Sequence, residues 1–166
     1  GADEASALCT ALTGSEAPVS IRRNPLKPVE TLPEAEVGAV PWCDAGCYLA
    51  ARPRFTYDPL LHAGCYYVQE AASMFVEQAY RRIVADFQPH RLLDLCAAPG
   101  GKSTLWRSLL PAEHLLVANE PIRQRAQILA ENLAKWGHPD TVVTSAYPAE
   151  FAGLGNLFDV VADDVP

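Results

Sequence analysis

Residues 92–104 read LLDLCAAPGGKST and decide how the second half of the chain folds. An apolar run containing one acid leads into a turn of small residues, after which Lys-Ser-Thr opens a helix. A Walker-type phosphate loop has the pattern G-x-x-x-x-G-K-[ST], and Cys96 stands where its first glycine belongs. The glycine spacing of a dinucleotide-binding loop is not met either. What remains is a strand ending in a small-residue turn, the setting in which an open α/β sheet binds a ligand at its carboxyl edge.

The composition is that of a globular protein. The 166 residues are 49% hydrophobic and 20% charged, enough to bury a core in one domain or two small ones. The net charge of −7 argues against a broadly basic nucleic-acid coat, although it is compatible with a local basic groove. No apolar stretch approaches the roughly 20 residues of a membrane span, and the N-terminus lacks the pattern of a secretory signal. We therefore expect a soluble, cytoplasmic protein with no membrane partner.

The cysteines predict neither a disulfide framework nor a metal site. Their number, five, is odd, and they are spread through apparent core and loop positions, so reduced thiols are expected. Cys43 and Cys47 alone supply too few ligands for zinc. We expect no metal.

Residues 1–68 suggest a small α+β module. Residues 1–41 are rich in Pro and Glu and show little periodicity, except that alternation around residues 21–27, IRRNPLK, suits a strand or an extended edge. Aromatic residues and glycines punctuate residues 40–68, as in short strands joined by turns. From Gln69 onward the apolar residues have helical spacing, and Pro89 enforces a stop. A helix is thus expected to lead into the second segment.

Residues 69–166 predict a parallel sheet with crossover helices. RLLDLC, LLVANE, TVVTSA and FDVVADDV read as strands, separated by KSTLWRSLL and by IRQRAQILAENLAKW, which Gly137 closes. Apolar runs without polar alternation suit strands covered on both faces. Four strands are fewer than a doubly wound sheet normally has, so we expect the chain to stop in mid-domain. FDVVADDV would then border an incomplete sheet, where unpaired backbone groups favour self-association.

Two acids follow strands of this sheet. Glu120 lies 20 residues after Gly100, about the spacing at which an acid accepts hydrogen bonds from ribose hydroxyls. The alternative is an acid that caps the following helix. Asp164 ends the fourth strand at the same edge, although Asp163 and Asp164 are also compatible with a solvated strand end.

Basic residues offer two further hypotheses. Lys102 falls in the first turn of a helix, where the dipole disfavours a cation, and this indicates an anionic or electron-rich neighbour unless the side chain extends to water. The second hypothesis is an RNA-contacting surface beside aromatic side chains; the alternative is a set of scattered, solvent-facing arginines. The residues in question are Arg22, Arg23, Lys27, Arg52 and Arg54.

Taken together, these motifs resemble the RNA cytosine-5 methyltransferases of the Nol/Nop/Sun family, and most closely its bacterial ribosomal-RNA branch. The most specific match is CAAPGGK, residues 96–102, after an LLDL strand. The resemblance covers most of the chain from about residue 20. Its supporting motifs are IRRNPLK at 21–27, VPWCDAGCYL at 40–49, YVQEAASM at 67–74, ANE at 118–120 and DVP at 164–166.

The resemblance implies a Rossmann-like S-adenosylmethionine-dependent methyltransferase fold over residues 69–166, behind an RNA-recognition-like module over residues 1–68. It implies RNA as substrate, ribosomal rather than transfer RNA, and it places Asp164 and Lys102 at the catalytic centre. The cofactor-binding residues that it implies are Cys96, Ala97, Ala98, Pro99, Gly100, Gly101, Lys102, Glu120, Tyr147 and Asp164.

The chain departs from the family pattern at two places. Tyr147 stands where the family often has an acid near the adenine, so ring packing would replace that contact. The family motif also continues after Asp-x-Pro with a cysteine, and another follows downstream, whereas this chain ends at Pro166. None of the five cysteines present matches a nucleophile position. We therefore expect an N-terminal part of the enzyme that is catalytically silent by itself.

Two alternatives remain at this point. One is a naturally short module that binds S-adenosylmethionine or RNA without catalysis; a Cys-Ser-Gly sequence beyond Pro166 would argue against it. The other is a nucleotide-phosphate enzyme that uses residues 101–103, and magnesium-dependent ATP binding would support it.

Overall fold

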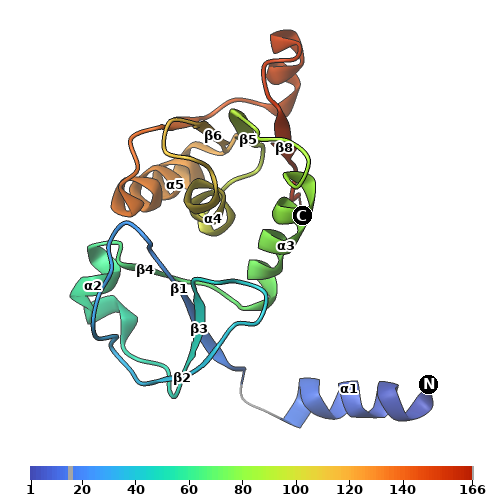
Figure 1. The fold of residues 1–166 in the computed structure, drawn as a ribbon, viewed down its shortest axis with the longest axis vertical. Helices are drawn as coiled ribbons and strands as arrows, with labels where there is room; N and C mark the ends of the chain where they lie inside the picture. Colours follow the sequence, from blue (N-terminus) through green and yellow to red (C-terminus); the bar gives the residue numbers. More distant parts are fainter. Residues whose placement is uncertain (15–16, 166) are drawn as a thin grey trace.

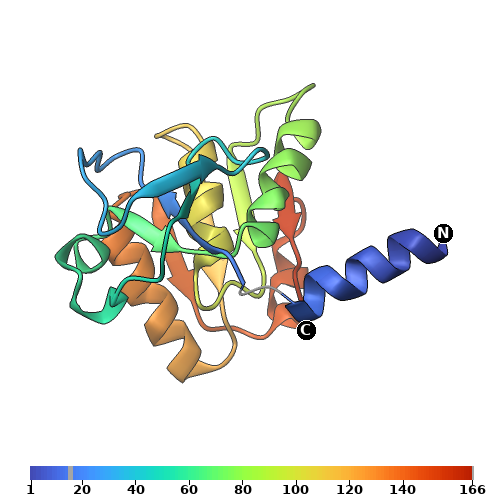
Figure 2. The same cartoon turned by 90° about the horizontal axis from the view of Figure 1, so that it is seen from below.

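The computed structural model describes residues 1–14 and 17–165. Two sheets, each four-stranded in these residues, make up the body of the molecule. Figure 1 shows the parallel sheet and its helices in the upper part, the antiparallel sheet in the lower part, and one N-terminal helix standing away from both. The view turned by 90° in Figure 2 shows the same separation of that helix from the body. The sequence-predicted combination of an α/β domain and a small α+β module is confirmed.

The antiparallel sheet has the strand order β2-β3-β1-β4. Its strands are β1 Val19–Arg23, β2 Glu36–Ala39, β3 Gly46–Leu49 and β4 Tyr66–Val68. The predicted strand at IRRNPLK corresponds to β1, which pairs with both β3 and β4 and is therefore an interior strand. The 3-10 helix η1 Phe55–Tyr57 and the short helix α2 Pro59–His62 connect β3 to β4. Asp58 caps α2 by accepting a hydrogen bond from the backbone N–H of Leu60 at 2.9 Å.

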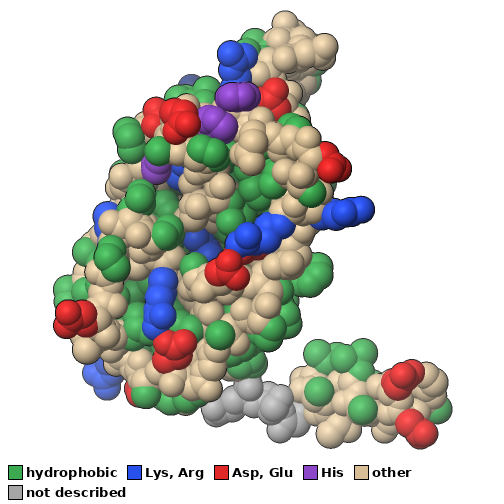
Figure 3. Space-filling view, viewed as in Figure 1, with side chains coloured by type: hydrophobic (Ala, Val, Ile, Leu, Met, Phe, Trp, Pro, Cys, Tyr) green, Lys and Arg blue, Asp and Glu red, His purple; other side chains and the backbone are tan. Residues whose placement is uncertain are grey.

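Helix α1 Ala2–Gly14 was not anticipated from the sequence. The side chains of residues 1–13 are exposed, including Leu8 and Leu12, so α1 buries no face and shows no clear apolar stripe. It contains several alanines, the strongest helix formers, and places Asp3 and Glu4 in its first turn. Figure 3 shows this helix separate from the body, with hydrophobic side chains on its surface and acids toward its N-terminal end.

The helix predicted from Gln69 to Pro89 is shorter than expected. The backbone N–H of Gln69 donates to the carbonyl of Ser20 at 3.3 Å, so residue 69 still continues the strand pairing of β4 and is unavailable to a helix. A 3-10 turn, η2 Ala72–Phe75, precedes the α-helix α3 Val76–Ile83. Residues 85–88 are exposed, and without an apolar face to bury the helix ends well before Pro89.

The second sheet is parallel, as the alternating pattern predicted, and its strand order is β7-β6-β5-β8. The strands are β5 Arg91–Asp94, β6 Leu115–Asn119, β7 Thr141–Thr144 and β8 Val160–Ala162; the connecting helices are α4 Gly101–Leu109, α5 Arg123–Trp136 and η3 Pro148–Leu154. The chain proceeds outward from β5 to β7 and then returns to place β8 on the other side of β5. This reversal opens a crevice at the carboxyl ends of β5 and β8, the position where doubly wound sheets bind ligands. Within residues 1–14 and 17–165, β8 is an outer strand of the sheet.

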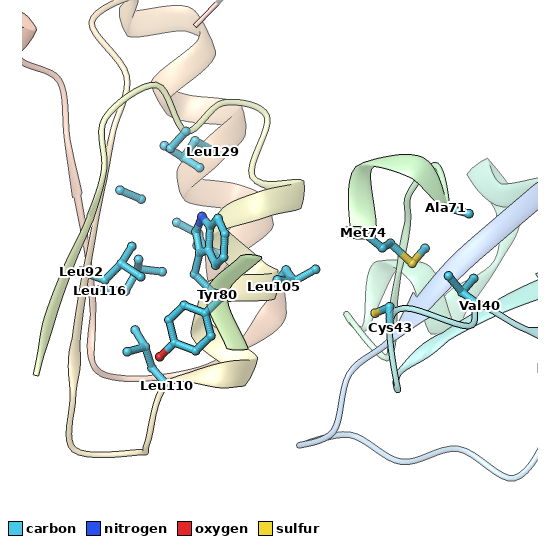
Figure 4. Close-up of a cluster of buried hydrophobic side chains, with 14 residues drawn as sticks. Val40, Cys43, Ala71, Met74, Tyr80, Leu92, Leu105, Leu110, Leu116 and Leu129 are labelled. Carbon is cyan, nitrogen blue, oxygen red and sulfur yellow. The ribbon is translucent and has the colours of Figure 1, made fainter. Parts of the chain in front are cut away.

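One core joins the two modules. Figure 4 shows Leu92, Leu116, Leu105, Tyr80 and Leu129 packed beside the parallel sheet, and a second group of buried side chains from the small module and the segment that follows it. That second group consists of Val40, Cys43, Ala71 and Met74. Burial of these apolar side chains in a single cluster stabilises the contact between the modules.

Arg22 adds a polar connection between the modules. Its Nε donates to Gln69 Oε1 at 2.9 Å, and its Nη2 donates to the carbonyl of Gly101 at 3.1 Å. The guanidinium also lies 4.6 Å from the centre of the Trp136 ring. With 1% of its surface exposed, Arg22 is not part of an RNA-facing surface, and that sequence hypothesis is wrong for this residue.

Two other members of the suggested basic surface are engaged within the module. Arg23 forms an ion pair with Glu36. The Lys27 ammonium donates to the carbonyls of Ala63 at 2.9 Å and Lys135 at 2.6 Å. Arg52 and Arg54 are exposed.

Candidate active site

A cavity of about 730 Å³ lies at the carboxyl ends of β5 and β8 and is bordered by the end of β4. Eight of the ten sequence-predicted site residues line it: Cys96, Ala97, Ala98, Pro99, Gly101, Lys102, Glu120 and Asp164. Its remaining lining residues are Tyr67, Val68, Gln69, Glu70, Ser73, Pro121, Ile122, Arg125 and Val165. Residues that are far apart in the sequence thus converge on one site, as expected for the switch point of a parallel sheet.

Hydrogen bonds to neighbouring strands and helices hold the small-residue loop in place. The backbone N–H of Ala97 donates to the carbonyl of Asn119 at 2.8 Å. From α5, Arg125 donates to the carbonyl of Ala98 at 3.1 Å, and the Asn132 amide donates to that of Pro99 at 2.7 Å. These bonds fix the loop backbone, and its small side chains leave that backbone accessible from the cavity.

Gly100 does not line the cavity. A glycine is needed at this position because of the backbone conformation. It is the N-cap of α4 with φ of +113°, a conformation that residues with a side chain rarely adopt. A Cβ atom there would lie 3.3 Å from Leu129 Cδ1 and 3.5 Å from Asn132 Cβ. Glycine therefore allows the loop to turn into α4 against the side of α5.

Glu120 places a buried carboxylate at the cavity. Only 2% of the residue is exposed. Its Oε1 accepts a hydrogen bond from the backbone N–H of Ile122 at 3.0 Å, and its Oε2 lies 3.5 Å from Arg125 Nη1. The two roles considered from the sequence are compatible, because the carboxylate supports the turn that precedes α5 and also lines the cavity.

Lys102 and Asp164 form an ion pair across the crevice between β5 and β8. The anionic neighbour that the position of Lys102 indicated is therefore Asp164, which follows the end of β8. The Lys102 side chain is 31% exposed and that of Asp164 is 61% exposed, so both are accessible to a molecule in the cavity.

Asp94 is the last residue of β5 and interacts electrostatically with both charges of this pair. It is buried, and its Oδ2 accepts a hydrogen bond from the Ser103 hydroxyl at 2.6 Å. Burial raises the pKa of Asp94 to about 6, an effect that the Ser103 hydrogen bond and Lys102 oppose and Asp164 reinforces. A change of charge at Asp94 near neutral pH would thus change the electrostatic interaction of Asp94 with Lys102 and Asp164.

Cys96 is the one described cysteine that lines the cavity. Burial raises the pKa of its thiol, and the carboxylates of Asp163, Glu120 and Asp94 raise it further. The reactive species of cysteine is the thiolate, so this environment disfavours nucleophilic attack.

The sequence interpretation missed the contribution of the segment after β4. Tyr67, Gln69 and Ser73 line the cavity, although residues 69–73 were read as an ordinary start of a helix. The Gln69 side-chain carbonyl accepts from Arg22, which fixes the orientation of its amide. The sequence signal for this segment is the position of YVQE at the end of a strand. The contact that orients Gln69 is not visible in a local pattern, because its partner Arg22 lies 47 residues earlier.

Tyr147 does not line the cavity. It is 72% exposed and precedes η3, where its backbone N–H donates to the Glu150 carboxylate at 2.6 Å. Packing of its ring on an adenine stays a prediction. The last residue of the predicted DVP motif, Pro166, lies outside the described residues.

Residues 1–14 and 17–165 contain no group of three or more His, Cys, Asp or Glu side chains arranged to hold a metal ion. None of the helices in this part of the chain has the length and apolar character that a membrane span needs.

Two family models match the chain. The model for the N-terminal domain of 16S rRNA methyltransferase RsmF matches residues 1–71, and the model for 16S rRNA methyltransferase RsmB/F matches residues 83–166.

Curated relatives carry the name ribosomal RNA small subunit methyltransferase F. The protein from Vibrio atlanticus (strain LGP32) is 34% identical over 137 residues, which is 79% of this chain and 28% of that protein. The protein from Vibrio cholerae serotype O1 (strain M66-2) is 32% identical over 139 residues, with 80% and 28% covered. The chain thus spans about 28% of the length of these relatives.

Solved structures share the fold. A methyltransferase homolog protein from Pyrococcus horikoshii superposes with a TM-score of 0.74 at 25% identity, covering 92% of this chain and 51% of that one. NSun6 from the same organism superposes with a TM-score of 0.74 at 14% identity, covering 99% and 67%.

Proposed function

Since the chain belongs to the 16S rRNA methyltransferase RsmB/F family, we propose that its cavity binds S-adenosylmethionine and receives a cytidine of ribosomal RNA, which the whole protein methylates at carbon 5. The observation that carries the proposal is the convergence of the 96–102 loop, Glu120 and the Lys102–Asp164 pair on one cavity at the switch point of the sheet.

The residues present fit this cofactor. A buried carboxylate at Glu120 offers oxygens to ribose hydroxyls, and the small side chains of residues 96–98 leave room for close approach of the methionine part. The lining contains three acids, Glu70, Glu120 and Asp164, against two bases, Lys102 and Arg125, a balance that suits a sulfonium cation. When bound, the cofactor supplies an electrophilic methyl group.

Asp164 and Lys102 are proposed to act on the cytosine ring. Carbon 5 of cytosine is a poor nucleophile until a thiolate adds to carbon 6, and the ring nitrogen then needs a partner for its proton or developing charge. Once that nitrogen carries a proton, the Asp164 carboxylate can accept a hydrogen bond from its N–H, while the ion pair with Lys102 orients the carboxylate.

We propose that these 166 residues bind the cofactor but do not transfer the methyl group by themselves. Cys9 lies on α1, away from the cavity, whereas Cys43, Cys47 and Cys65 are buried and do not line it. Cys96 lines the cavity with a raised thiol pKa. The thiolate that attacks carbon 6 would therefore come from outside these residues.

The proposal also includes the organisation of the chain and its setting. Residues 1–68 are proposed as an RNA-recognition-like module and residues 69–166 as part of the methyltransferase domain of a cytoplasmic enzyme. The alternative of a non-catalytic module that binds S-adenosylmethionine or RNA predicts the same cofactor binding, but no methylation by any longer form of the protein.

The test is methylation of 16S ribosomal RNA by the whole protein that contains this chain, read as 5-methylcytidine by mass spectrometry of the digested RNA. Asp164→Asn is expected to lower the methylation rate by about a hundredfold or more, because it removes a charged partner of the reacting ring. Asp86→Asn, a matched change at an exposed residue outside the cavity, is expected to have no effect. Formation of 5-methylcytidine at an unchanged rate by the Asp164 variant would contradict the proposed role.

A further inference from the structure

A second cavity, of about 440 Å³, lies beside the candidate active site. The same three residues, Val68, Gln69 and Glu70, line both cavities, so a single short segment separates them. The rest of the second cavity is lined by Ala17, Pro18, Val19, Ser20, Trp42, Tyr48, Arg52, Ala71 and Ala72.

The wall between the two cavities is held by hydrogen bonds from the small module. The Ser20 hydroxyl donates to the carbonyl of Gln69 at 2.6 Å, and the Trp42 indole N–H donates to the carbonyl of Ala71 at 2.7 Å. Both donors are themselves lining residues of the second cavity. The second cavity is therefore a defined feature of the fold, with its aromatic wall fixed relative to the active site.

The side chains around this cavity suit a nucleotide. Trp42 and Tyr48 supply aromatic surface, on which any base can stack. Arg52 is exposed and lies 5.6 Å from the centre of the Phe55 ring, which keeps a cation at the rim where a phosphate can approach. The exposed Glu70 carboxylate offers an acceptor for an exocyclic amine or a ribose hydroxyl. Stacking surface next to a cation and an acceptor is the combination by which proteins hold single-stranded RNA.

We propose that this second cavity binds the nucleotide adjacent to the target cytidine in single-stranded RNA, with its base on Tyr48 and Trp42 and its phosphate at Arg52. The inference rests on the proposed function, because the first cavity must receive the target. It assigns the Val68–Glu70 segment the task of separating two neighbouring bases, so that one enters the active site while the other is held outside it.

The test uses a short, fluorescein-labelled oligouridylate with one central cytidine, titrated with this chain in the presence of S-adenosylhomocysteine and followed by fluorescence anisotropy. Arg52→Gln and Tyr48→Leu are each expected to weaken RNA binding about tenfold, as loss of a phosphate contact or of one base stack does. Arg54→Gln and Tyr57→Leu are the matched controls, because both residues are exposed members of the same module outside every cavity described here. Calorimetric binding of S-adenosylhomocysteine is expected to be unchanged in all four variants.

Tyr48 packs against the shared core, so its variant is first checked for folding by circular dichroism. Arg52 is exposed, and its variant decides the question if the Tyr48 variant is unfolded. RNA binding that is absent in the wild type, or equal in the Arg52 variant and its control, would overturn the inference even where S-adenosylhomocysteine binds normally. Failure of the wild type to bind S-adenosylhomocysteine would instead count against the proposed function, whatever the RNA result.

Discussion

The Arg22 guanidinium of β1 donates from Nη2 to the Thr104 hydroxyl of α4 at 2.5 Å. Thr104 lies one turn into the helix that begins at the candidate cofactor loop, and its hydroxyl also donates to the carbonyl of Gly100 at 2.8 Å. The antiparallel sheet is thus bonded through two side chains to the loop that borders the active site. Burial lowers the pKa of Arg22 to about 10, so the residue remains charged at neutral pH.

Arg22→Met is expected to lower the free energy of unfolding by about 2 to 4 kcal/mol, because buried acceptors at Gln69 and Gly101 lose their charged donor. Urea denaturation followed by circular dichroism measures this. Arg82→Met, at an exposed position on α3, is the control and should change the same quantity by no more than about 0.5 kcal/mol. Equal stability of the two variants would show that the Arg22 contacts contribute nothing.

Gly100→Ala is expected to destabilise the chain by roughly 1 to 3 kcal/mol, since the residue has φ of +113° and its Cβ would crowd Leu129. Gly153→Ala is the matched change at a glycine whose Cβ would meet nothing within 4 Å and whose φ is not positive. Thermal unfolding of both variants separates the two cases. A Gly100 variant as stable as the Gly153 variant would mean that the loop can turn into α4 in another way.

Asp94 predicts a pH dependence of stability. Its folded-state pKa of about 6 lies above the ordinary value of 3.8, so between these pH values the folded chain binds more protons than the unfolded chain. The Asp94 contribution to stability therefore falls as the pH rises from about 4 to about 6. Asp94→Asn removes this pH-dependent contribution. As the pH rises from about 4 to about 7, the free energy of unfolding of the variant should therefore increase by roughly 2 to 3 kcal/mol relative to that of the wild type.

The measurement for Asp94 is the free energy of unfolding in urea at several pH values. Asp86→Asn, at an exposed acid, is expected to follow the wild-type curve. If the Asp94 variant also ran parallel to the wild type, a raised pKa at Asp94 would be ruled out.

Strand β8 predicts concentration-dependent self-association of the chain. It is an outer strand of the parallel sheet in residues 1–14 and 17–165, and Val161 on it is 54% exposed. An exposed apolar edge strand is a template for pairing with a second copy, and a charged side chain there disfavours such pairing. Val161→Lys should therefore reduce any dimer seen by sedimentation velocity. A wild-type chain that sediments as a monomer at every concentration would contradict this prediction.

The parallel sheet was readable from the sequence because its strands are short apolar runs separated by helices of ordinary length. The same pattern locates the ends of β5, β6 and β8. It therefore predicts that residues 96–102, Glu120 and Asp164 lie at one edge of the sheet. The position of a residue at the carboxyl end of a parallel strand is a local property, and local properties are visible in a sequence.

Other features depend on contacts that no local pattern encodes. Arg22 reads as a surface base, but its partners at residues 69, 101, 104 and 136 are supplied by distant parts of the chain. Helix α1 buries no face and so shows little periodicity to detect. Gln69 looked like the start of a helix, although its backbone pairs with Ser20 and its side chain with Arg22. For Arg22 and Gln69 tertiary contacts overrode the local signal, whereas α1 simply lacks an apolar stripe.

The most direct test of the proposed cofactor site is a calorimetric titration of this chain with S-adenosylhomocysteine, run on the wild type, Glu120→Gln and the exposed control Glu131→Gln. The wild type and the control are expected to bind with equal affinity, and Glu120→Gln about 10- to 100-fold more weakly, as expected when a charged hydrogen-bond acceptor is lost. Magnesium-ATP is expected not to bind. Absence of S-adenosylhomocysteine binding, or equal binding by the Glu120 variant, would contradict the assignment of this cavity to the cofactor.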